Sequence, residues 1–435
     1  MISKLFVTGL LGCICVMPVW SQHRKVLGIE ELFSLADANS KSLKVHQLAV
    51  DEAIQAIKVA KNDRLPSVEA SLSFSYIGDG WMSDRDFSNG MKADMPHWGN
   101  NFAFKATQAI YTGGAVSTGI EISELQKKMA EAELDNDKQN VRFMLVGHYL
   151  DLFQLNNQKR IYEKNIEQTR LLIAEIQAAF EQGTALKSDI TRYELQLKNL
   201  ELGLTNVINS MRILNRQLVT TIGLDADTEI LPDTALLAVE IEKRSELHWQ
   251  NERNSAPVMR MADLNVSMNE RQQDLARAGR RPVIGLVAAN NFDGPILIEV
   301  PPINKNFNYW YVGVNVTYKF DSLFKNNKKL KKACLGTLKA QENRRLAEEQ
   351  LSNGINAAYI NLEEAYTCLD TKEKNVQLAH ENYEVVHSRY LNGLSLVTDM
   401  LDASNIQLSS ELELSNAQVG ILYQYFMLKK TVGTL

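Results

Sequence analysis

The chain has 435 residues, of which 45% are hydrophobic and 23% are charged, and its net charge at pH 7 is −5. This acidic balance, and the lack of a basic cluster with interleaved aromatic residues, argue against a nucleic-acid partner. Length alone allows two or three ordinary domains.

The first 21 residues differ from the rest of the chain. Lys4 precedes an apolar run from Leu5 to Trp20, which predicts a secretory signal peptide spanning residues 1–21. A second interpretation stays open, because the four residues that end at Cys13 match a lipoprotein box in which Cys13 is lipidated. Beyond residue 21, no apolar run approaches the ~20 residues that a membrane-spanning helix needs.

Two predicted strands follow a first apolar-periodic stretch. Residues from Ser67 to Tyr76 alternate strictly between apolar and polar side chains, and those from Asn101 to Tyr111 form a less regular partner. Strands of about ten residues with one apolar and one polar face are typical of a transmembrane barrel. For any single strand, the alternative is a half-buried sheet in a soluble protein.

A very long helix is predicted next, from Ile120 to Gln182, where Gly147 is the one glycine and proline is absent. About 63 residues would form a rod of roughly 95 Å, whereas helices of globular proteins average about 11 residues. After a turn at Gly183, the return helix carries a heptad seam, which predicts knobs-into-holes packing in an antiparallel hairpin. The seam consists of Ile190, Tyr193, Leu197, Leu200, Leu204, Val207, Met211, Leu214 and Leu218.

The second half of the chain repeats this order. We predict strands from Val283 to Phe292 and from Trp310 to Phe320, then a long helix from about Leu323 to Leu391. The return helix has a weaker seam, with Asn405 and Ser415 as polar gaps. The loops 77–99 and 293–308 are predicted to be the outward tips of the strands. Aromatic residues near the strand ends suit an interfacial girdle, and these are Trp81, Trp98, Tyr309 and Trp310.

The two halves share a motif at an offset of 210 residues. An aromatic residue, a glycine, a leucine and an aspartate recur with the same spacing at each helix turn. A period of this length is too long for a solenoid and indicates two copies of one structural half, which we place at 22–240 and 241–435. The matching residues are Phe180, Gly183, Leu186 and Asp189, and then Tyr390, Gly393, Leu396 and Asp399.

Only two cysteines, Cys334 and Cys368, lie beyond the predicted signal peptide. Both fall within the second long helix, where their separation of 34 residues corresponds to about 50 Å. This distance is too large for a disulfide within one chain. We expect two buried, apolar thiols without a redox role.

The duplicated order of helix, strand, strand, long helix, glycine turn and long helix resembles the TolC family of outer-membrane efflux channels. The resemblance runs from about Leu27 to Leu435. It implies a mostly α fold with a membrane β-barrel: a homotrimer with a twelve-stranded barrel, four strands per chain, and a periplasmic tunnel of long coiled-coil hairpins. It also implies a passive outer-membrane conduit in a tripartite efflux or type I secretion system, which docks to a periplasmic adaptor protein and through it serves an inner-membrane pump.

The resemblance also assigns roles to residues at the two helix turns. The family's periplasmic gate matches Asp399, Asp402, Asp189 and Tyr390. In the best-known members an arginine follows the second tip glycine by two residues, but here that residue is Ser395, so the way the tip closes is left open. The tips on which an adaptor docks match Gly183, Thr184, Ala185 and Leu186, and Gly393, Leu394, Ser395 and Leu396.

The acidic pair also has a physical interpretation of its own. Asp399 and Asp402 are three residues apart and therefore share one face of a helix. Three chains would bring six carboxylates together, and such a ring attracts cations and divalent ions. The alternative is that the two residues cap or solvate the start of a helix, because aspartate is common in a first turn.

No arrangement of residues typical of catalysis is present, so we expect neither an enzyme nor a bound cofactor or metal. The seven histidines are scattered, and a packed or solvated pair is the expected role of His380 and His387. The rival class is a periplasmic coiled-coil adaptor or structural spacer without a pore, which would have one hairpin and a β-rich module. The sequence does not specify the exported substrate, which could be a drug, a metal or a protein.

Overall fold

The computed structural model describes residues 24–233, 244–299 and 302–435. The predicted signal peptide, Cys13 and the predicted repeat boundary at 240/241 lie outside these residues. The described chain divides into two compact units. We call residues 24–40, 144–233 and 365–423 the hairpin unit, and residues 41–143, 244–299, 302–364 and 424–435 the sheet unit.

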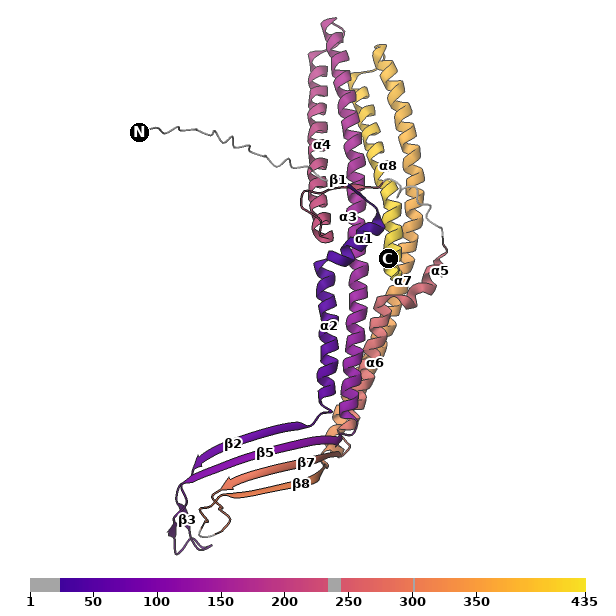
Figure 1. Cartoon of the computed structure of the whole chain (residues 1–435). Helices are drawn as coiled ribbons and strands as arrows, with labels where there is room; N and C mark the ends of the chain where they lie inside the picture. Colours follow the sequence, from indigo (N-terminus) through magenta and orange to yellow (C-terminus); the bar gives the residue numbers. More distant parts are fainter. Residues whose placement is uncertain (1–23, 234–243, 300–301) are drawn as a thin grey trace, which may run out of the picture. The chain divides into compact units, whose positions relative to one another are not determined.

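The order of the described elements follows the predicted duplication (Figure 1). A helix of 22 residues, two long strands, a very long helix and a return helix occur in this order in each half, so the predicted mostly α fold with an internal repeat is confirmed. The elements are β1 (Arg24–Leu27), α1 (Ile29–Asn39), α2 (Lys41–Asn62), β2 (Ser67–Tyr76), β3 (Gly80–Met82), β4 (Met91–Ala93), β5 (Trp98–Tyr111), α3 (Ala115–Glu181), α4 (Lys187–Ile222), β6 (Glu229–Pro232), α5 (Glu246–Glu252), η2 (Arg253–Ser255), α6 (Pro257–Ala278), β7 (Val283–Gly294), β8 (Phe307–Thr317), α7 (Ser322–Leu391) and α8 (Val397–Val432).

Helices α3 and α7 are as long as the sequence predicts, with 67 and 70 residues. Among the described residues, none of the helices combines the length and the apolar run that are needed to cross a membrane. The heptad seam of α4 is also confirmed, because all nine of its residues are buried or half-buried. The hairpin unit therefore contains two antiparallel pairs, the later part of α3 with α4 and the later part of α7 with α8.

A small parallel pair, β1 with β6, closes the other end of the hairpin unit and was not predicted from the sequence. Tyr149 of α3 is buried beside it. Its hydroxyl donates to the carbonyl oxygen of Leu27 at 2.7 Å and accepts the N–H of Asp233 at 2.7 Å. Asn39 of α1 similarly donates to the carbonyl oxygen of Ile222, at the end of α4. These bonds satisfy backbone groups at the ends of β1, β6 and α4, which would be costly to bury without a partner.

The sheet unit contains one antiparallel sheet with the order β2-β5-β7-β8. Its two outer strands, β2 and β8, each lack a second neighbour within the described chain. Because side chains alternate between faces along a strand, the register gives one apolar face, including Val68, Leu72 and Val312, and one largely polar face, including Ser71 and Ser73.

Several details of the predicted strands were wrong. Strand β5 begins three residues earlier than predicted, at Trp98, and β7 ends two residues later, at Gly294. Strand β8 begins at Phe307 and ends at Thr317, so Tyr318 and Phe320 lie beyond it, because β7 pairs with β8 only over this register. Tyr309, which we expected in a girdle with Trp310, lies on the opposite face from Trp310, since neighbours in a strand alternate. The first tip loop contains a short hairpin, β3 with β4, that was not predicted.

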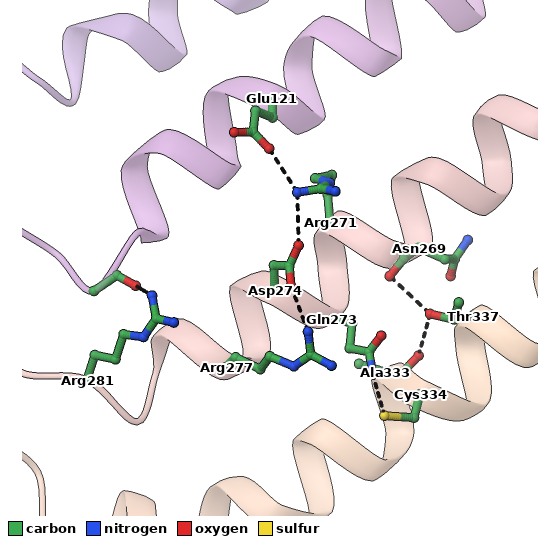
Figure 2. Close-up of polar contacts among 11 residues, drawn as sticks. Glu121, Asn269, Arg271, Gln273, Asp274, Arg277, Arg281, Ala333, Cys334 and Thr337 are labelled. Atoms are coloured by element: carbon green, nitrogen blue, oxygen red, sulfur yellow. Dashed lines mark hydrogen bonds and ion pairs between the residues drawn. The ribbon is translucent and has the colours of Figure 1, made fainter.

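Polar contacts join α6 to both α3 and α7 in the sheet unit (Figure 2). Arg271 of α6 lies 3.3 Å from the carboxylate of Glu121 on α3. Thr337 of α7 donates to the backbone carbonyl oxygen of Asn269 at 3.3 Å. Helix α6 is thus fixed to one long helix from each half of the chain.

The cysteines only partly match the prediction. Both lie in α7, as expected, and neither forms a disulfide. Cys334 is half-buried and its sulfur accepts a hydrogen bond from Gln273 at 2.7 Å (Figure 2). Cys368, however, is exposed, so the expectation of two buried thiols was wrong. Helical periodicity alone does not place Cys368 inside, because α7 has a weak apolar stripe.

The junction of β5 and α3 requires glycine at position 113. Gly113 has a φ of 67°, and a Cβ there would lie 2.7 Å from the Cβ of Arg281 and 2.8 Å from the carbonyl oxygen of Ala278. The guanidinium of Arg281 also donates to the Gly113 carbonyl oxygen at 3.0 Å (Figure 2). Arg281 thus fixes the start of β7 to the end of β5.

We therefore predict that Gly113→Ala lowers the free energy of unfolding by roughly 2 kcal/mol or more, since strain at positive φ and a steric clash add together. The matched control is Gly119→Ala in α3, where a Cβ meets nothing within 4 Å. That change should be neutral or stabilising by up to about 1 kcal/mol. Thermal unfolding followed by circular dichroism compares the two, and equal midpoints would contradict this account of the junction.

Candidate functional site

The two helix turns named by the sequence have the same backbone structure. At the first turn, Gly183 has a φ of 76° and its N–H donates to the carbonyl oxygen of Phe180 at 2.9 Å. The N–H of Thr184 donates to the carbonyl oxygen of Ala179, also at 2.9 Å. This pair of bonds is a Schellman motif, which ends a helix at a left-handed glycine.

The second turn repeats that motif 210 residues later. Gly393 has a φ of 70°, and its N–H donates to the carbonyl oxygen of Tyr390 at 3.0 Å. The N–H of Leu394 donates to the carbonyl oxygen of Arg389 at 2.8 Å. The Arg389 side chain returns to the Leu394 carbonyl oxygen at 3.4 Å. An arginine therefore does support this tip, from the last turn of α7 and not from position 395.

The spacing of the aspartates that the two turns share also has a local cause. The carboxylate of Asp189 accepts the N–H of Leu186 at 3.1 Å, and that of Asp399 accepts the N–H of Leu396 at 3.0 Å. Each aspartate thus satisfies a backbone donor at the start of its helix. Asp402 is exposed and makes no hydrogen bond or ion pair within the described part of the chain. Asp399 therefore caps α8, whereas Asp402 has a free carboxylate.

The predicted docking residues divide into exposed and packed side chains. Leu186, Leu394 and Leu396 are each about two-thirds exposed, at 67%, 68% and 69%. Ala185, in contrast, packs against a buried cluster, and Ser395 is half-buried. Three exposed leucines at two neighbouring turns form an apolar surface of the kind that marks a contact with another protein.

The cluster beneath the turns joins the four helices of the two hairpins, and we call it the tip cluster. Tyr390 packs against it, and Asp402 lies in sequence between two of its members, Met400 and Ala403. Because members come from both hairpins, the cluster fixes the two turns relative to each other. Its buried residues are Leu172 and Ile176 of α3, Tyr193 of α4, Tyr383 of α7, and Val397, Met400 and Ala403 of α8.

Burial determines the ionisation of the tyrosines in this region. Desolvation raises the pKa of Tyr193 and, to a smaller extent, the pKa of Tyr383 above the ordinary value. The pKa of Tyr390 is raised first by burial and then by the nearby carboxylate of Asp189. The structure thus brings Asp189 and Tyr390 close together, although no hydrogen bond joins them within the described residues.

A buried carboxylate that sequence reasoning missed lies further along the same helices. The side chain of Glu411 on α8 is only 10% exposed. Its Oε1 lies 2.9 Å from Nε2 of His380 on α7 and 3.2 Å from Nζ of Lys164 on α3, and it accepts a hydrogen bond from Gln407 at 3.2 Å. Glu411 therefore links three helices, but its own helix offers no pattern that distinguishes it from other glutamates.

The two histidines considered as a pair have separate partners. His380 contacts Glu411, as described above, whereas His387 stacks on Tyr383 with ring centroids 5.8 Å apart. Its Nε2 lies 3.8 Å from Oε2 of Glu175. Over the described ranges, no group of three or more His, Cys, Asp or Glu residues is arranged to hold a metal ion.

The fold and the two tips can be compared with known proteins. A profile of the family described as "Outer membrane efflux protein" matches residues 32–224 and 249–434, one segment in each half of the chain. The outer membrane protein TolC of Vibrio cholerae serotype O1 is 19% identical, over 99% of this chain and 95% of that protein.

Solved channels have a similar fold at low sequence identity. The outer-membrane channel OprN has a TM-score of 0.75 and 16% identity, covering 94% of this chain and 90% of that one. The outer membrane protein VceC of Vibrio cholerae has a TM-score of 0.73 and 15% identity, with coverages of 93% and 96%. The open state of the MtrE outer membrane channel of Neisseria gonorrhoeae has a TM-score of 0.72 and 16% identity, with coverages of 93% and 88%.

The hydroxyl group of Tyr193 is buried in the tip cluster. Its oxygen has no hydrogen-bond partner within the described structure, so Tyr193→Phe should raise the free energy of unfolding at neutral pH by about 1 kcal/mol. Wild-type stability should also fall as the pH rises above about 10, because the unfolded tyrosine loses its proton there while the buried one, with its raised pKa, retains it. Tyr193→Phe should reduce this alkaline loss.

The measurement is the thermal midpoint between pH 7 and pH 11 in detergent. Tyr162→Phe serves as the matched control, because Tyr162 lies on α3 outside the tip cluster. A destabilised Tyr193→Phe protein at pH 7 would contradict the prediction and would mean that the hydroxyl finds a partner in the assembled protein.

Proposed function

We propose, because this chain belongs to the outer membrane efflux protein family, that three copies assemble into one export channel whose entrance lies at the two helix turns. Family membership makes the protein an outer-membrane efflux channel with a periplasmic helical extension. The trimer, the gate and the docking partners go beyond family membership and are proposed here. It involves no bond-making step.

The sheet supports assembly from several chains. Four strands do not close a membrane barrel, since about eight is the smallest number known. The open edge of β8 can pair with the open edge of β2 in the next copy, and three chains then give twelve strands. In such a barrel the apolar face with Val68, Leu72 and Val312 contacts lipid. The proposed repeats, 22–240 and 241–435, each contribute two strands and one hairpin to a protomer.

The tips support an entrance that is opened from outside. Leu186, Leu394 and Leu396 are exposed, and we assign them to contact with a periplasmic adaptor protein, through which an inner-membrane pump is coupled. The docking set also includes Gly183, Thr184, Ala185, Gly393 and Ser395. An adaptor that binds both turns would act on the tip cluster directly below them.

The main evidence for a gate at the turns is the tip cluster, to which both hairpins contribute residues. Opening separates the hairpins there, and Asp189 and Tyr390 lie at this contact. Asp402 has a free carboxylate, and Asp399 lies one turn earlier on α8. In a trimer these two positions would form a ring of six carboxylates that attracts cations. The spacer without a pore has no support in a family of efflux proteins.

Asp402→Asn and Asp399→Asn test this gate in single-channel recordings from planar bilayers. Asparagine keeps an oxygen that can accept the Leu396 N–H, so Asp399→Asn removes the charge while it retains the cap. The wild type should conduct weakly, prefer cations and be blocked by divalent ions. Each variant should lower the preference for K⁺ over Cl⁻ by roughly twofold or more, because three charges leave the ring.

The matched control is Asp370→Asn, since Asp370 is an exposed acid on α7 outside the tip cluster. Its selectivity should equal that of the wild type. Unchanged selectivity in both tip variants would still agree with a channel, but it would show that these residues do not form its gate. Folded protein that never conducts would contradict the proposal as a whole.

A further inference from the structure

The polar face of the sheet is hollowed. A cavity of about 550 Å³ lies against the sheet, and its lining includes Lys105, Thr107, Tyr311, Asn315 and Thr317. The register places all five of these side chains on the same face as the serines of β2. The hollow therefore lies on the polar face, opposite the apolar residues that face lipid in the proposed barrel.

Three aromatic residues stand in a row on this polar face, and we call them the aromatic row. Phe307, Tyr309 and Tyr311 occupy every second position of β8, so their side chains point to the same side of the sheet. The rings of Phe307 and Tyr309 stack with centroids 5.4 Å apart and planes inclined by 26°. The row spans about 13 Å along the strand. All three side chains are exposed, at 54%, 40% and 45%.

Small neighbours surround the ring of Tyr311, the member of the row that is not stacked on another ring of the row. Tyr311 lies opposite Ala289 of β7, and Gly313 follows it on the same face of β8. The next residues along the hollow are Asn315 and Thr317, which offer an amide and a hydroxyl. A solute in the hollow can therefore stack on the Tyr311 ring and form hydrogen bonds at the same time.

The polar face carries little net charge over β2, β5, β7 and β8. Glu69 and Lys105 occupy directly opposed positions on β2 and β5. Asp293 accepts a hydrogen bond from the side chain of Asn101. Opposite charges in neighbouring positions largely cancel at a distance, so this face neither attracts nor rejects ions strongly. It differs in this respect from the acidic positions at the helix turns.

We propose that the aromatic row is a transient binding site inside the pore for uncharged solutes that carry both an aromatic ring and hydroxyl groups. The inference rests on the proposed function, which makes the polar face the pore lining. Closing the barrel pairs β8 with β2 of the next copy and brings a row of serines beside the aromatic row. Rings then stack on Tyr309 and Tyr311, while hydroxyl groups bond to the serines, Asn315 and Thr317.

Phenyl β-D-glucoside is a suitable probe because it joins a ring to an uncharged sugar, and methyl β-D-glucoside is the same sugar without the ring. In planar bilayers with the purified full-length trimer, phenyl glucoside should cause transient current blockades that methyl glucoside does not. Tyr309→Ser/Tyr311→Ser should shorten these blockades by about 2- to 10-fold, since ring stacking is lost. Trp310→Leu is the matched control, because Trp310 lies on the opposite face of the same strand.

Equal blockade of the wild type by the two glucosides would overturn the inference, and so would blockades that persist unchanged in the double variant. If the double variant forms no pores, the comparison of the two probes on the wild type decides the question. A wild-type protein that does not conduct contradicts the proposed function. A conducting wild type that does not distinguish the probes contradicts only this inference.

Discussion

Two helical hairpins share one apolar cluster near their turns, and the proposed gate depends on this contact. A single antiparallel pair cannot bury its apolar stripe on all sides, so Ile176, Tyr193 and Met400, each at most 1% exposed, pack between the pairs. Burial of one such side chain contributes about 1.5–3 kcal/mol. Separating the hairpins therefore costs the burial of several side chains, which explains why opening would need a partner that binds the exposed leucines at the turns.

Polar contacts continue the link between the hairpins beyond the cluster. Gln196 of α4 donates to Asn405 of α8 at 2.8 Å, so the polar gap predicted in the α8 seam is a specific contact. Glu411 contacts Lys164 of α3 and His380 of α7. Such contacts contribute little net stability compared with apolar burial, but they fix which residues lie opposite each other. At the contact between the two hairpins, apolar burial thus provides most of the stability and polar pairs fix the register.

The features that could be predicted from the sequence are those determined by residues close together in the chain. The glycine turns, long helices and strand alternation depend on neighbours within a few residues, and Gly183, Gly393 and the serines of β2 reveal them directly. Asp399 was assigned to a gate by resemblance, and the structure adds its cap on Leu396, which the spacing alone had left as an alternative. Contacts between distant segments, such as β1 with β6 and Glu411 with Lys164, leave no local pattern. The sequence did not predict the face on which Tyr309 lies, because the apolar alternation suggested a strand that begins at Trp310. In the structure β8 begins earlier, at Phe307, and therefore includes Tyr309.

A cross-link between the two hairpins shows whether the channel opens by separating them. In a Cys334→Ser/Cys368→Ser background, Gln196→Cys and Asn405→Cys place thiols at the observed α4–α8 contact, and a short cleavable thiol cross-linker can join them within one chain. Single-channel recordings of the purified trimer would then be made before and after cleavage of the linker. We expect cross-linked channels to stay at a low conductance, and we expect reduction of the linker to restore openings to higher levels. Cross-linked channels that open as often and as widely as the reduced ones would contradict opening by separation of the hairpins.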